Sequence, residues 1–134
     1  CRQEYLARLS GPLLDRFDIR INVPPVPLSQ MIDDAKGEAS ADVAVRVEVA
    51  QTAQMARQGC LNARLDGEAL RELTAPDGKG RKLLDAVIAE SALTARGFNR
   101  ILRVARSLAD LAGRGAVGET DIATALVWRG HDLQ

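Results

Sequence analysis

Aromatic residues are scarce in this chain of 134 residues, which has one Trp, one Tyr and two Phe. A hydrophobic core must therefore be built from Leu, Val, Ile and Ala, which favours helices packed on helices. Charge of one sign is also lacking, because 18 basic residues balance 18 acidic ones. The composition thus gives no strongly basic surface for nucleic acid, although it leaves room for a local patch.

Metal-ligating residues are few and dispersed. Cys1 and Cys60 lie far apart without a CxxC pair, and His131 is the single histidine. We therefore expect no metal site, and we expect two reduced thiols in a cytoplasmic protein, with a disulfide as the alternative. The sequence has no apolar run of about 18 residues and no recognisable signal peptide, so we expect no membrane contact.

The first part of the chain predicts a helix, a turn and one strand. Residues 2–9 have apolar side chains at helical spacing, and Gly11-Pro12 ends this pattern. Residues 17–23 alternate apolar and polar side chains, as in a half-buried strand. The proline-rich residues 24–27 predict a stiff, extended connector.

This connector suggests a boundary between residues 1–27 and residues 28–134. A lone strand needs neighbours for its backbone hydrogen bonds, so we expect its partners to lie outside this chain. The chain also begins with Cys1 instead of Met, and we therefore expect it to be a piece of a longer protein.

The second part predicts a series of helices. Alternating valines at residues 43–49 would by period alone indicate a strand, but the run continues unbroken to residue 57, so we predict a helix. Ser40, Asp66 and Thr94 are suitable N-caps. The predicted helices cover residues 29–34, about 40–58, 66–73, 82–93, 94–112 and about 119–128.

Arginines mark the two segments whose side chains could bind an anion or take part in a reaction. Arg16 lies between two carboxylates just before the predicted strand, and by local chemistry it pairs with Asp15 or Asp18. Arg96, Arg100 and Arg103 fall on one stripe of the predicted helix 94–112, opposite its apolar face. Such a stripe of like charges is expected to meet anions, which are either nearby carboxylates or phosphate.

Two long motifs resemble the magnesium-chelatase-like AAA+ ATPases, with the competence-protein branch most similar. They are residues 5–19 (YLARLSGPLLDRFDI) and residues 94–111 (TARGFNRILRVARSLADL). The resemblance covers nearly the whole chain. It implies a mainly α fold: an AAA+ C-terminal helical lid bundle, preceded by one strand from the end of the α/β ATPase core.

The resemblance also implies roles for three arginines. Arg16 matches the arginine finger, which reaches the γ-phosphate of ATP on the neighbouring subunit of a hexameric ring. Arg96 matches the sensor-2 residue, which contacts the nucleotide, and Arg100 is a weaker candidate for that role. Phe98-Asn99 and Ser107 depart from the family pattern, but both arginines of the motifs are kept.

The chain lacks a phosphate-binding G-x-x-x-x-G-K-[ST] loop and a strand that ends in the Asp-Glu pair for Mg²⁺. We therefore expect ATP and Mg²⁺ to be bound by other parts of the full-length protein, and no ATP hydrolysis by this piece alone. By family resemblance the ring would remodel DNA as a branch-migration helicase in natural transformation. The alternatives are a motor that drives Mg²⁺ insertion into protoporphyrin and a free-standing helical adaptor.

Overall fold

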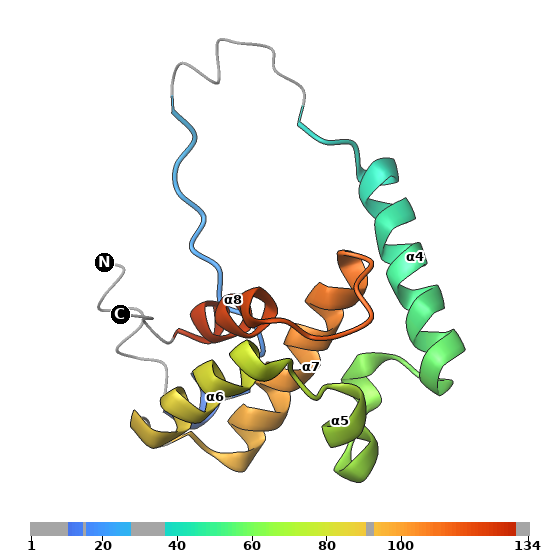
Figure 1. Cartoon of the computed structure of the whole chain (residues 1–134). Coiled ribbons are helices and arrows are strands. Elements are labelled where there is room, and N and C mark those ends of the chain that lie inside the picture. Colours follow the sequence, from blue (N-terminus) through green and yellow to red (C-terminus); the bar gives the residue numbers. More distant parts are fainter. Residues whose placement is uncertain (1–10, 15, 28–36, 91–92, 131–134) are drawn as a thin grey trace.

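A computed structural model describes residues 11–14, 16–27, 37–90 and 93–130 of this chain (Figure 1). The predicted helices at residues 2–9 and 29–34 lie outside these ranges. The described elements are α2 (Gly11–Leu14), α4 (Ser40–Gln58), the 3-10 helix η1 (Asn62–Arg64), α5 (Gly67–Leu73), α6 (Gly78–Glu90), α7 (Ala95–Leu111) and α8 (Glu119–Arg129).

Helix α7 lies at the centre of the fold and packs against α8, α4, α5 and η1, while α6 packs against α8 (Figure 1). Its apolar stripe faces inward, as predicted, because residues at helical spacing share one side. The buried core consists of aliphatic side chains, as the scarcity of aromatics predicts: Leu65, Leu70, Leu84, Ile101, Leu102, Ala105, Ala109, Val117, Ile122, Ala125 and Leu126.

Two of the predicted caps are present. The side chain of Thr94 accepts a hydrogen bond from the backbone N–H of Gly97 (3.0 Å) at the start of α7. Asp66 accepts one from the backbone N–H of Gly67 (2.9 Å) at the start of α5. The third prediction is off by one residue, because Ala39 is the N-cap of α4 and Ser40 is its first helical residue.

Helix α6 begins four residues earlier than predicted. Gly78 of the Pro-Asp-Gly turn is already helical, because the preceding Asp77 caps the helix. The carboxylate of Asp77 accepts a hydrogen bond from the backbone N–H of Gly80 (2.8 Å). Gly80 is buried, and a Cβ there would lie 3.3 Å from the backbone nitrogen of Glu119. The absence of a side chain therefore allows the first turn of α6 to approach the first turn of α8.

The predicted strand at residues 17–23 is wrong. These residues are exposed and form an extended segment without strand pairing, which runs beside α8 and then away from the helices (Figure 1). The described part of the chain contains no strand that could pair with them, so their alternating pattern has no sheet to fit. Residues 24–27 continue as the predicted extended connector.

Helix α4 spans residues 40–58 as predicted, although its first half stands apart from the other helices (Figure 1). Residues 37–49 are all exposed, and Ala50 and Gln54 are the buried residues of this helix. Val43 and Val47 are less exposed (37% and 40%) than the valines between and after them. The alternating valines therefore lie on two different stripes of the helix. The stripe of Val43 and Val47 continues into the buried Ala50 and Gln54.

The prediction of a mainly helical lid bundle is confirmed, without the strand. Cys60 is a half-buried free thiol, and Cys1 lies outside the described residues. No described helix has the length and apolar character needed to span a membrane.

Candidate functional site: an arginine loop held on the helical bundle

Residues 16–20 form a loop, here called the Arg16 loop, which α7 holds through Arg100. Nη1 of Arg100 donates a hydrogen bond to the backbone carbonyl oxygen of Arg16. The same nitrogen lies 3.0 Å from Oδ1 of Asp18 in an ion pair. The Arg100 side chain is 21% exposed and that of Asp18 is 58% exposed, so the contact lies at the edge of the bundle. One guanidinium group thus contacts the loop on both sides of residue 17.

Helix α8 holds the same loop from its C-terminal end. Arg129 is buried, and its Nη1 donates a hydrogen bond to the backbone carbonyl oxygen of Phe17 (3.3 Å). The backbone N–H of Arg20 donates to the backbone carbonyl oxygen of Trp128 (2.7 Å). The backbone of the Arg16 loop is therefore attached to the bundle at residues 16, 17 and 20.

The side chain of Arg16 itself is exposed and has no hydrogen-bond or ion-pair partner among the described residues. Asp18 pairs with Arg100, so the alternative of an Arg16–Asp18 pair is wrong. Asp15 lies outside the described residues. The structure thus fixes the backbone around Arg16 and leaves its guanidinium group accessible to another molecule.

The predicted arginine stripe of α7 is present, but its members have different surroundings. Arg103 donates from Nε to the backbone carbonyl oxygen of Leu65 (2.8 Å) and lies 3.7 Å from the carboxylate of Asp66. Arg100 and Arg103 therefore meet carboxylates within the chain, one of the two alternatives that the sequence left open. Arg96 is exposed and makes no hydrogen bond or ion pair with the residues that the structure describes.

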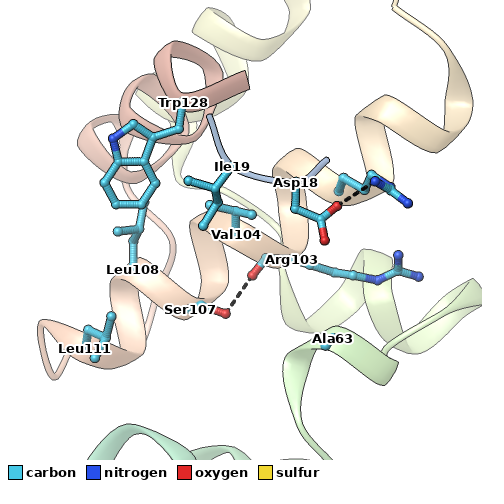
Figure 2. A pocket seen from close by; sticks show the side chains of 10 residues that line it. Asp18, Ile19, Ala63, Arg103, Val104, Ser107, Leu108, Leu111 and Trp128 are labelled. Atoms are coloured by element: carbon cyan, nitrogen blue, oxygen red, sulfur yellow. Dashed lines mark hydrogen bonds and ion pairs between the residues drawn. The ribbon is translucent and has the colours of Figure 1, made fainter. Parts of the chain in front are cut away.

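A pocket of about 380 Å³ lies between the Arg16 loop and α7 (Figure 2). Figure 2 shows the side chains of Ile19, Val104 and Trp128 around it, and the hydroxyl of Ser107 bonded to the carbonyl oxygen of Arg103 (2.9 Å). Arg100 and Arg103 also line it, but the loop and η1 region already engage their guanidinium groups. The pocket therefore offers mainly apolar walls.

A polar cluster around the buried Asp110 was not predicted. Asp110 of α7 accepts hydrogen bonds from Nη1 and Nη2 of Arg57 (2.7 and 3.0 Å) and from Nδ2 of Asn62 (2.8 Å). It also accepts bonds from Nε and Nη2 of Arg106 (3.1 and 2.8 Å). Burial alone would raise the pKa of Asp110, but these donors outweigh burial and lower the pKa below its ordinary value.

This Asp110 cluster joins the end of α4 and η1 to α7. Arg106 is 1% exposed and also donates to the backbone carbonyl oxygens of Arg114 and Gly115 (2.6 and 2.7 Å). It thereby shapes the turn between α7 and α8. A sequence signal existed, because Arg106 and Asp110 continue the i, i+4 row of the buried Leu102. Charged residues in an apolar row indicate a buried ion pair.

Two family models match this chain, one in each of its two parts. Residues 37–129 match the family described as magnesium chelatase, subunit ChlI C-terminal, and residues 1–31 match magnesium chelatase, subunit ChlI. The first match covers α4 to α8, and the second includes Arg16 and its loop.

Curated relatives extend over nearly the whole chain. Competence protein ComM of Haemophilus influenzae is 36% identical over 126 residues, which are 93% of this chain and 25% of the relative. YifB of Escherichia coli is 35% identical over 131 residues (96% and 26%), and a Mycobacterium tuberculosis protein is 38% identical over 132 residues (96% and 26%). The chain thus spans about a quarter of the length of these relatives. Together with the match over α4 to α8, these similarities show that the chain belongs to the magnesium-chelatase-like family.

Proposed function

We propose that this chain is the arginine-finger loop and helical lid of a longer, ring-forming ATPase whose ATP sites lie between subunits. The observation that carries this proposal is the state of Arg16: its backbone is attached to the bundle while its guanidinium group is exposed. A fixed backbone with an accessible cation suits a group that must reach phosphate on another subunit.

Arg96 is proposed to contact a bound nucleotide as the sensor-2 residue. Of the four arginines of α7, Arg96 alone lacks a hydrogen-bond or ion-pair partner among the described residues. The planar guanidinium fork can donate two charge-assisted hydrogen bonds to phosphate oxygens. Arg100 is a weaker candidate for this contact because its guanidinium group already binds the Arg16 carbonyl oxygen and the Asp18 carboxylate.

The phosphate-binding loop and the carboxylates for Mg²⁺ are proposed to lie in other parts of the full-length protein. The guanidinium groups of Arg16 and Arg96 fit phosphate oxygens, whereas a Mg²⁺ ion requires oxygen ligands. We therefore propose that the chain alone does not hydrolyse ATP. Turnover by the purified chain above that of a mock purification would contradict this assignment.

Replacing Arg96 with alanine is expected to leave the bundle stable, with the free energy of unfolding within about 0.5 kcal/mol of the parent, because its side chain is exposed. In the full-length protein the same change is expected to weaken nucleotide binding or its coupling to hydrolysis. Urea unfolding of this chain and nucleotide titration of the full-length protein measure the two effects. Arg103→Ala is the matched control for nucleotide binding, and an Arg96→Ala chain that unfolds would instead indicate a structural ion pair.

DNA is the proposed substrate of the ring, on the basis of the similarity to a competence protein. The alternative is a motor for Mg²⁺ insertion into protoporphyrin, which the description of the matching family suggests. Steady-state ATP hydrolysis of the full-length protein with branched DNA or with protoporphyrin separates them. We expect branched DNA to stimulate hydrolysis and protoporphyrin to leave it unchanged, and the reverse result would favour the chelatase motor.

A further inference from the structure

We propose that Arg100 and Arg129 are positioning residues, which hold the Arg16 loop on the lid of the same subunit so that Arg16 is presented to the neighbouring one. This inference rests on the proposed role of Arg16 as a finger. It adds that the lid contributes to the neighbour's ATP site by holding the loop that carries Arg16.

The first argument is that the Arg16 loop depends on these contacts for its conformation. Residues 16–20 are all exposed and belong to no helix or strand. Both arginines contact backbone carbonyl oxygens of the loop, those of Arg16 and Phe17. They therefore fix the path of the backbone and do not engage the side chain of Arg16, which is exposed.

The second argument is that Arg129 lies against the first turn of α7. A Cβ at Gly97 would lie 3.0 Å from Nη2 and 3.3 Å from Nε of Arg129, so the glycine leaves the space that the guanidinium group needs. Arg129 is itself buried, with 6% of its surface exposed. Its position is therefore set by α7 as well as by α8.

The third argument is that the residues concerned lie within little more than one turn of α7. Arg96 precedes Gly97 directly, and Arg100 follows four residues after Arg96. A shift of this turn when Arg96 meets a nucleotide would also shift both groups that hold the Arg16 loop. The geometry thus gives a short route from the proposed nucleotide contact of Arg96 to the loop that carries Arg16.

A misplaced finger should lower the rate of the chemical step much more than the affinity for ATP. A displacement of about 1 Å in a catalytic group can cost about 100-fold in rate. We expect Arg100→Ala and Arg129→Ala in the full-length protein to lower kcat by about 10- to 100-fold, with KM for ATP nearly unchanged. Arg129→Lys keeps a donor for the carbonyl oxygen of Phe17 and should recover part of kcat.

Mixed rings test whether the defect acts in trans. Subunits with Arg100→Ala keep their own ATP site, and subunits in which the phosphate-loop lysine is replaced keep a well-placed finger. If Arg100 positions the finger, a mixture of these two impaired proteins hydrolyses ATP faster than either protein alone. If Arg100 acts on the ATP of its own subunit, the mixture hydrolyses ATP no faster than the impaired proteins alone, which would overturn the proposal. Arg129→Ala is tested in the same way.

Arg16→Ala in the same mixture separates this inference from the proposed function. If Arg16→Ala subunits do not complement, the finger assignment itself is wrong. If they complement and Arg100→Ala subunits do not, the finger stands and the positioning role falls. Arg103→Ala is the matched control, because the Arg103 side chain contacts Leu65 and Asp66 but not the loop. This variant should keep kcat within about twofold of the parent. Ring assembly of each variant is checked by sedimentation, and Arg100→Ala decides the test if Arg129→Ala does not assemble.

Discussion

Replacement of Arg16 with alanine in the full-length protein is expected to lower ATP hydrolysis by about 10³-fold or more, while ATP binding stays largely intact. A finger stabilises negative charge that develops on the transferred phosphoryl group, and such a group contributes about 10³–10⁵ in rate. Its loss should leave the ATP site of the same subunit complete. Single-turnover hydrolysis and binding of a fluorescent nucleotide measure the two quantities separately.

Two further variants sharpen this experiment. Arg16→Lys keeps the positive charge but lacks the planar fork, so it should restore only a small part of the rate. Arg20→Ala removes another exposed arginine of the same loop, and its backbone contact with Trp128 is kept. Its turnover should stay within about twofold of the parent. Hydrolysis at the parental rate in Arg16→Ala rings would show that Arg16 is not the finger.

Replacement of Asp110 with alanine is expected to destabilise the bundle by about 3–5 kcal/mol. The change leaves the guanidinium group of Arg106, which is 1% exposed, without its carboxylate partner, and an uncompensated buried charge has this cost. The loss is a large part of the 5–15 kcal/mol that stabilises a typical domain. Urea unfolding of the chain, followed by circular dichroism, measures it. Asp85→Ala is the control, because its pair with Arg81 is exposed and should contribute less than about 1 kcal/mol.

The same carboxylate gives the bundle an acid-sensitive component. The pKa of Asp110 lies below its ordinary value of 3.8 in the folded state, so the ionised form is favoured by folding. Its contribution is therefore complete above the ordinary pKa and is lost as the pH falls through the lower, folded-state pKa. We expect the parent chain to lose stability over this acid range and Asp110→Asn to lack that part of the loss. An equal acid loss in both proteins would contradict this origin.

The helices could be predicted because each carried its own signals. Thr94 and the apolar row of residues 98–109 define α7 without reference to the rest of the fold. The unbroken run that follows the valines indicated that α4 is a helix. The period of two within that run reflects exposure on both sides of a helix that stands apart, so it carried no information about a sheet.

The features that were missed depend on contacts between distant residues. Residues 17–23 have the pattern of a strand, but strand formation needs partners that the described chain does not offer. The Asp110 cluster brings together residues up to 53 positions apart, and local patterns cannot pair Arg57 with Asp110. Likewise, the sequence grouped Arg96 and Arg100 on one stripe. Only the structure shows that the guanidinium group of Arg100 binds the Arg16 loop.

Helix α4 is attached to the bundle by its C-terminal half, so a rotation there produces a larger displacement at its N-terminal end. Its C-terminal end is pinned by the bonds of Arg57 and Gln58 to Asp110 and Asn62, while residues 40–49 extend from the bundle. The last attachment before this projecting part is the buried Ala50, so at 1.5 Å per residue Ser40 lies about 15 Å beyond it. A rotation of the attached half by about 10° would therefore move the projecting end by about 3 Å. A small rotation of the half of α4 that packs on α7 would thus appear at the far end of this lever arm as a displacement of a few ångströms.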